Sequence, residues 1–171
     1  ELGGKAANIV YEDAAIDQAV EGVVNGIFFN QGHVCCAGSR LLLQESIHDQ
    51  FISKLEKRMQ SLRVGNPLDK NTDIGAINSK EQLDKITNLV NEGLEDGGEL
   101  FQTQCDLPGN GFWFKPTLFT NVQPSYSIAR EEIFGPVLTT LTFRTPEEAV
   151  EIANNTEYGL SAGVWTEKGS K

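Results

Sequence analysis

Cysteine is scarce in this sequence, and its three cysteines are not arranged as a disulfide framework needs. Cys35 and Cys36 are neighbours, and the third, Cys105, leaves the number odd. Neighbouring cysteines seldom bridge each other, so we expect these thiols to stay reduced. Reduced thiols are typical of intracellular proteins, and the location we expect is cytoplasmic.

Basic residues and long apolar runs are also lacking. The sequence has 14 Lys and Arg against 24 Asp and Glu, a net charge of −10. Binding to a phosphate backbone needs a basic surface, so we expect no nucleic acid partner. No apolar run approaches the roughly 20 residues that a transmembrane helix requires, so no membrane-spanning segment is expected. The remaining composition, 39% hydrophobic over 171 residues, predicts one globular domain over residues 1–171.

Strand-like and helical patterns alternate along the chain. This alternation predicts an α/β fold with a layered, mostly parallel sheet. Strands are expected at residues 7–11, 41–44, 99–103, 117–120, 137–143 and 163–166. Four helices are expected between them, near residues 13–28, 46–62, 79–94 and 145–154.

Each expected helix has a start signal. These signals are Asp13, Ser46 with Asp49, Ser79 with Gln82, and Thr145 followed by Pro146. Gly22 and Gly26 weaken the first helix, so close packing against a neighbour is expected at both. The inward stripe of the third helix is predicted to be Leu83, Ile86, Val90 and Leu94.

The segment Asn30–Gly38 (NQGHVCCAG) places Cys35 between glycines, just after the first helix. Backbone N–H groups of a turn can point at a sulfur and can hold an oxyanion. The competing interpretation is a buried, inert cysteine, which is the commoner case beside an apolar helix. His33 next to Cys35 and Cys36 suggests a metal site, but the C-x₂-C spacing and a second ligand pair are missing, so no metal is expected.

Carboxylates supply the other candidates. Glu1 lies 34 residues before Cys35 and could act as a general base. The segment Glu131–Pro136 (EEIFGP) combines two carboxylates with an aromatic ring before an apolar strand. Carboxylates of this kind bind ribose hydroxyls in nucleotide sites. The alternative is a charged loop with Phe134 in the core.

Three segments, ELGGKAA at residues 1–7, NQGHVCCAGSR at 30–40 and EEIFGPV at 131–137, resemble the aldehyde dehydrogenase superfamily in order and spacing. The resemblance is to its thiol-bearing catalytic domain, a three-layer αβα domain, and covers essentially all 171 residues. It implies that Cys35 is the nucleophile and that Glu1 activates the deacylating water. It also implies cofactor-binding positions at Glu132 (nicotinamide ribose), Phe134 (beside the nicotinamide), Leu2 and Gly3 (bordering backbone) and Gln82 (adenosine ribose).

The implied reaction is the oxidation of a small-molecule aldehyde to a carboxylic acid, with NAD or NADP as the cofactor. The implied parent protein is longer and homo-oligomeric, with an N-terminal cofactor domain and a C-terminal segment outside these residues. The isolated residues are therefore expected to show little turnover. His33 departs from the Gln or Glu usual in the family, which keeps open a non-catalytic scaffold module as the alternative. Residues 41–46 and 143–149 further resemble family 16 aldehyde dehydrogenases.

Overall fold

A six-stranded sheet of order β3-β4-β5-β2-β1-β6 forms the centre of the computed structural model, which describes residues 1–170. The strands are β1 (Ala7–Val10), β2 (Arg40–Gln44), β3 (Glu99–Gln102), β4 (Thr117–Thr120), β5 (Val137–Phe143) and β6 (Ala162–Trp165). Every neighbouring pair is parallel except β3 with β4, which is antiparallel. The prediction of a mostly parallel sheet is confirmed.

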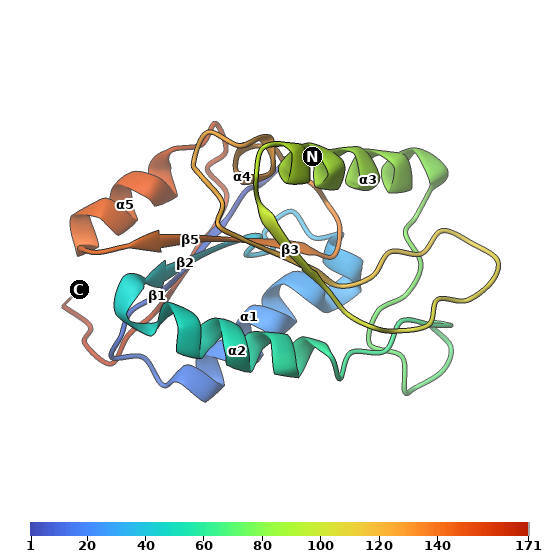
Figure 1. Cartoon of the computed structure of the whole chain (residues 1–171), viewed down its shortest axis with the longest axis horizontal. Helices are drawn as coiled ribbons and strands as arrows, with labels where there is room; N and C mark the ends of the chain where they lie inside the picture. The colour runs from blue at the N-terminus through green and yellow to red at the C-terminus, as the bar shows by residue number, and fades with distance from the viewer. Residues whose placement is uncertain (171) are drawn as a thin grey trace.

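Helices cover both faces of the sheet. They are α1 (Ile16–Phe28), α2 (His48–Met59), α3 (Lys80–Glu95), α4 (Ser127–Arg130) and α5 (Pro146–Asn154), with short 3₁₀ turns η1 (Phe29–Gly32) and η2 (Glu45–Ile47). In Figure 1, α1 and α2 lie on one face of the sheet, and α3, α4 and α5 lie on the other. This is the expected three-layer αβα arrangement. No helix within residues 1–170 has the length and apolar character needed to cross a membrane.

Strand β2 shows why the core has two sides. Leu41, Leu42 and Leu43 are all fully buried, as expected for a central parallel strand covered on both faces. Leu41 and Leu43 join the cluster formed with α1 and α2, whereas Leu42 joins the cluster on the α5 side. Successive strand side chains point to opposite faces, so one apolar run serves both layers.

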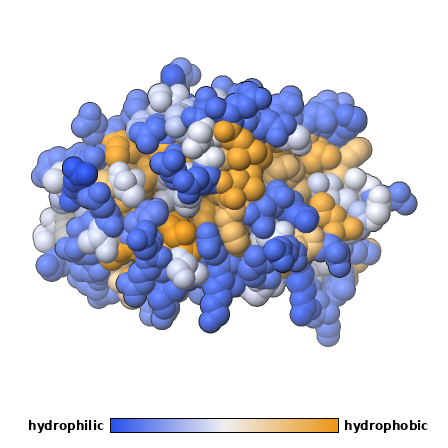
Figure 2. All heavy atoms as spheres, in the orientation of Figure 1, coloured by the Kyte–Doolittle hydropathy of each residue, from blue (hydrophilic) through white to orange (hydrophobic). Residues whose placement is uncertain are grey.

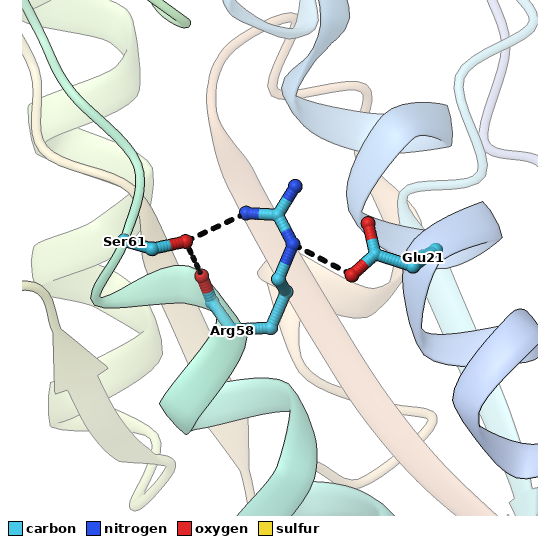
Figure 3. A network of polar contacts seen from close by, with 3 residues as sticks. All are labelled: Glu21, Arg58 and Ser61. Carbon is cyan, nitrogen blue, oxygen red and sulfur yellow. Dashed lines mark hydrogen bonds and ion pairs between the residues drawn. The ribbon is translucent and has the colours of Figure 1, made fainter.

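A polar network joins α1 to α2 at their outer surface. Arg58 Nε donates to Glu21 Oε1 at 2.7 Å, and Arg58 Nη1 donates to Ser61 Oγ at 2.8 Å, as drawn in Figure 3. Beneath it the two helices pack through buried side chains, among them Val20, Phe51 and Leu55. The apolar contacts supply most of the stability here, since exposed ion pairs contribute little.

Two of the four expected helix starts are confirmed. Ser79 Oγ accepts from Gln82 N, and Thr145 Oγ1 accepts from Glu148 N. The start at Asp13 is wrong: α1 begins at Ile16 without a side-chain cap, and Asp13 instead accepts from the Thr166 hydroxyl at 3.0 Å.

The start at Ser46 is also wrong. Helix α2 begins at His48 without a side-chain cap, and Ser46 Oγ donates to Glu12 Oε2 at 2.9 Å. The helix ends at Met59, so Leu62 lies beyond it, although its side chain is buried. Asp13 and Ser46, which the local pattern assigned to helix capping, instead form hydrogen bonds with residues from distant segments.

Two expectations about helix packing are half right. A Cβ on Gly22 would lie 2.1 Å from Trp165 Cζ2, so α1 does pack closely there, but Gly26 faces open space. In α3, Ile86 and Val90 are buried as predicted, whereas Leu94 is 46% exposed. Figure 2 shows a mostly hydrophilic face on which hydrophobic atoms reach the surface across the middle, over the β3 region.

Candidate active site

The three motifs found in the sequence meet at the amino ends of three neighbouring strands of the sheet. Residues 1–6 directly precede β1, residues 35–39 precede β2, and residues 132–136 precede β5. These strands are neighbours in the order β5-β2-β1, and Ala7, Arg40 and Thr139 are paired across them. The parallel register therefore brings together segments that are more than 100 residues apart, at the amino ends of three strands.

Glycines let the first motif touch the other two. A Cβ on Gly4 would lie 2.0 Å from the carbonyl oxygen of Cys35, and a Cβ on Gly3 would lie 3.0 Å from Glu132 Oε2. The Gly4 N–H donates to Glu132 Oε1 at 2.8 Å. Glu132 is thus fixed by the backbone of residues 1–6, next to the Cys35 segment.

Cys35 lies at the corner of a tight turn. The Ala37 N–H donates to the Val34 carbonyl at 3.0 Å, so Cys35 and Cys36 are the two central residues of that turn. Both thiols are exposed, and the Cys36 carbonyl accepts from Ser161 Oγ at 3.1 Å. The competing interpretation of a buried Cys35 is wrong, because the turn carries the residue to the surface.

The approach to this turn has an unusual backbone. Asn30, Gln31 and Gly32 have φ of 50°, 56° and 74°, a left-handed stretch that reverses the chain after α1. A Cβ on Gly32 would lie 2.1 Å from the Gly135 carbonyl oxygen, so the second motif also packs against the third. Only glycine combines a positive φ with this closeness.

Phe134 and Gln82 belong to the same cluster. Phe134 has φ +54°, and its ring stacks on the His33 ring with centroids 5.2 Å apart. Gln82 Nε2, from α3, donates to the carbonyls of Ile133 at 2.8 Å and Phe134 at 3.0 Å. Burial lowers the pKa of His33, which keeps the ring neutral at neutral pH.

Two buried cations beneath the site are absent from the sequence-based predictions. Lys5 is 1% exposed, and its Nζ has no hydrogen-bond partner within residues 1–170. Arg40 is 3% exposed and donates to the carbonyls of Lys5, Ile152 and Ala153 at 2.8–2.9 Å. The available signal was weak, because Lys and Arg beside a motif usually lie in solvent.

Glu1 and Leu2 lie at the solvent side of the cluster. Both are exposed, Leu2 by 71%, and the Glu1 carboxylate makes no hydrogen bond or ion pair within residues 1–170. The structure thus brings Gly3, Cys35, Glu132, Phe134 and Gln82 into one cluster, with Glu1 at its solvent side, three residues before Gly4. No three His, Cys, Asp or Glu side chains of the described residues gather closely enough to hold a metal ion.

Comparisons with known proteins agree on one family. The aldehyde dehydrogenase family matches residues 1–171. An aldehyde dehydrogenase of Emericella nidulans is 47% identical over 167 residues, which are 97% of this chain and 33% of that protein. The crystal structure of an NAD-dependent aldehyde dehydrogenase from Sinorhizobium meliloti has a TM-score of 0.93 at 44% identity, covering 99% of this chain and 34% of that one.

A betaine aldehyde dehydrogenase from Staphylococcus aureus, solved in complex with NAD⁺, has a TM-score of 0.93 at 37% identity. The match covers 98% of this chain and 34% of that one, so the chain spans about a third of the length of these relatives. These matches do not test the resemblance to family 16, which stays a prediction. Because the family matches every residue and the relatives exceed 30% identity over nearly the whole chain, this chain belongs to the aldehyde dehydrogenase family.

Proposed function

We propose that this chain is the thiol-bearing part of an enzyme that oxidises an aldehyde to a carboxylic acid with NAD. The observation that carries the proposal is the meeting of the Cys35 turn with Glu132 at the amino ends of β1, β2 and β5. The proposed nucleophile and the proposed ribose-binding carboxylate therefore lie close together at the amino ends of neighbouring strands. The relatives support the choice of NAD, since one is NAD-dependent and another was solved with NAD⁺.

Cys35 is the proposed nucleophile. Its thiolate adds to the aldehyde carbon, so a C–S bond forms and the carbonyl electron pair moves to oxygen. As that oxygen re-forms its double bond, the carbon loses a hydride and a thioester remains on Cys35. NAD⁺ supplies the acceptor for this hydride. The exposed corner position gives the sulfur access to a substrate from solvent.

Glu132 and Phe134 are proposed to hold the cofactor. Glu132 Oε1 accepts from Gly4 N–H, while Oε2 has no hydrogen-bond partner within residues 1–170 and remains an acceptor for a ribose hydroxyl. Gly3 borders the same carboxylate, since a Cβ on it would lie 3.0 Å from Oε2, and Leu2 precedes Gly3 in the chain. This donor and acceptor set fits the nicotinamide riboside half of the cofactor.

Glu1 is proposed to complete the cycle as the general base. Its carboxylate takes a proton from water, the water oxygen attacks the thioester carbon, and the C–S bond breaks to release the acid and the Cys35 thiolate. The carboxylate is exposed, which suits a group that must meet water. We expect little turnover from the 171 residues alone, because only Glu132, Phe134 and their neighbours are available to hold the cofactor.

Replacing Cys35 by Ala in the protein that carries this chain tests the proposal. Reduced cofactor is followed at 340 nm with a panel of aliphatic and aromatic aldehydes, and Cys35→Ala is expected to lower turnover on the order of a thousandfold or more. Cys36→Ala is the matched control, since it removes a neighbouring exposed thiol from the same turn. Turnover retained by Cys35→Ala would sink the proposal, and so would a wild-type protein inert toward every aldehyde.

A further inference from the structure

Phe134 is held in a conformation that it would seldom adopt unaided. Its φ of +54° lies in the left-handed region, where few residues other than glycine, Asn and Asp are found. A residue stays there only when its surroundings over-determine it. The groups that touch Phe134 are therefore the groups that decide where its ring lies.

Gln82 is the first of these groups. Its Nε2 donates to the carbonyls on both sides of the strained residue, at 2.8 Å to Ile133 and 3.0 Å to Phe134. Gln82 lies in the first turn of α3, whose start is fixed by Ser79 Oγ accepting from the Gln82 N–H. The Gln82 side chain therefore holds the loop before β5 in a fixed position relative to α3, a helix of 16 residues.

His33 is the second group. Its ring lies nearly parallel to the Phe134 ring, with 13° between the planes. The His33 Nε2 is buried and has no hydrogen-bond partner within residues 1–170, so the ring contributes its flat face rather than a polar contact. Gly32, the preceding residue, packs against the Gly135 carbonyl and locks the two loops together.

We propose that Gln82 and His33 are positioning residues that clamp Phe134 between them, and that they act on catalysis only through the placement of the Phe134 ring. The inference rests on the proposed function for its effect on turnover. It assigns Gln82 a role different from the contact with the adenosine ribose that the family resemblance implies. The positioning role uses the Gln82 amide nitrogen, which donates to the two backbone carbonyls, whereas its Oε1 takes no part in it.

Gln82→Glu is the sharpest single change. It keeps the size of the side chain and removes both donors, so the two carbonyls lose their partner. A Glu at this third helical position is favourable for the start of α3, so the helix itself is preserved. Asn88→Asp is the matched control, because it makes the same amide-to-carboxylate change on an exposed position of the same helix.

The first readout is independent of activity. Hydrogen–deuterium exchange is measured on the peptide covering residues 131–137, and Gln82→Glu is expected to speed exchange there about tenfold, as the loss of two hydrogen bonds implies. Asn88→Asp should leave that peptide unchanged. Equal exchange of this peptide in Gln82→Glu and Asn88→Asp would overturn the clamp, regardless of the catalytic activity of either variant.

The second readout is a double-mutant cycle on turnover. Gln82→Glu is expected to lower kcat/KM about tenfold in the wild-type background and less than about twofold once Phe134→Ala has removed the ring. The same factor in both backgrounds would show a direct contact with the cofactor and overturn the inference. His33→Phe, which keeps a flat ring, should retain the activity that His33→Ala loses.

The two readouts separate this inference from the proposed function. If the wild-type protein oxidises no aldehyde, the proposed function fails, and the exchange measurement still decides whether the clamp exists. Suppose instead that the wild type is active, that Gln82→Glu leaves the exchange of residues 131–137 unchanged, and that the double-mutant cycle shows no coupling between Gln82 and Phe134. The clamp then fails and the proposed function stands.

Discussion

Lys5 is the residue whose environment departs most from its ordinary chemistry. Burial, with the nearby positive charge of Arg40, lowers the pKa of Lys5 to about 7 from its usual 10.5. The charges of Glu132 and Glu131 act in the opposite direction and Lys85 adds to the lowering, but burial prevails. An ammonium without a hydrogen-bond partner in the interior costs free energy whenever it is charged.

The stability of the fold should therefore depend on the protonation of Lys5. Between about pH 7 and pH 10.5 the unfolded chain holds a proton that the folded chain has released, so the free energy of unfolding rises with pH across this window. Below about pH 7 both states hold the proton and the full cost is present. Lys5→Met removes the charge and is expected to stabilise the chain by several kcal/mol at pH 6, on the order of the pKa shift.

Urea unfolding of the wild type and of Lys5→Met at pH 6, 7.5, 9 and 10 measures this effect. Other groups titrate in the same range, but they cancel in the difference between the two proteins. The advantage of Lys5→Met should shrink steadily as the pH rises. An advantage that stays constant with pH would contradict a buried, titrating Lys5.

Cys35 and Glu132 could be singled out only through the family resemblance, because local patterns alone favoured an inert cysteine and a charged loop. Their catalytic and cofactor-binding roles stay predictions. The burial of Lys5 and Arg40 could not be predicted, since it depends on α5 and on the loop after it covering the start of β1 and β2. The roles of Glu1 and Leu2 stay predictions that rest on the family resemblance.

At the scale of elements, Arg40 fixes the end of α5. Its Nη1 and Nη2 donate to the carbonyls of Ile152 and Ala153 in the last turn of the helix, where the Ile152 carbonyl also accepts from the Asn155 N–H at 3.2 Å. Its Nε donates to the Lys5 carbonyl, just before β1. One buried side chain thus ties a helix end to the segment that holds Glu132.

Arg40→Met should therefore destabilise the chain more than the loss of an ordinary arginine. Three hydrogen bonds to backbone carbonyls, one buried and two partly buried, disappear, which is expected to cost about 3 kcal/mol in the free energy of unfolding. Arg58→Met, which breaks the exposed pair between α1 and α2, should cost less than about 1 kcal/mol. Denaturant unfolding compares the two, and equal midpoints would show that Arg40 does not anchor α5.

The elements themselves were largely predictable, and their details were not. Strand alternation and helical periodicity are local, so all six strands and four of the five helices could be predicted. Helix α4 has only four residues, too few to show a period. Leu94 was misplaced because Gly93 occupies the inward position, where a Cβ would lie 2.6 Å from Ile128 Cδ1. Because glycine has no side chain, the hydrophobic pattern of the sequence does not mark Gly93 as a buried position.

At the scale of the whole molecule, the sheet has two open edges among the described residues. Strand β3 forms one edge and exposes Leu100 by 36%, and β6 forms the other and exposes Val164 by 56%. Unpaired edge strands with apolar side chains are templates for pairing with another chain. The net charge of −10 opposes such pairing and is screened by salt.

The 171 residues by themselves should consequently self-associate, and more strongly in 0.5 M than in roughly 0.05 M salt, where screening is weaker. Sedimentation velocity across concentrations measures this, and Val164→Lys should reduce the association. Val150→Lys is the matched control, because Val150 is similarly exposed, by 55%, but lies on α5 away from the edge. Equal association of both variants would rule out the β6 edge as the contact.

The location of the site in the fold was not predictable from general rules. Open α/β sheets usually bind ligands at the carboxyl ends of their strands, and this cluster lies at the amino ends of β1, β2 and β5. Local patterns identified the three motifs, and the family resemblance predicted that they belong to one site. The strand order and the pairing of Ala7, Arg40 and Thr139 show how the motifs meet.

The missing Cβ atoms at Gly4 and Gly32 have a consequence for how such motifs evolve. Both glycines are required by packing between loops, at distances of 2.0 and 2.1 Å that no side chain can enter. A descendant that lost all catalysis but kept its shape would still need them. The glycines of the motifs therefore report on the shape of the fold, and only the thiol and the carboxylates between them bear on the proposed chemistry.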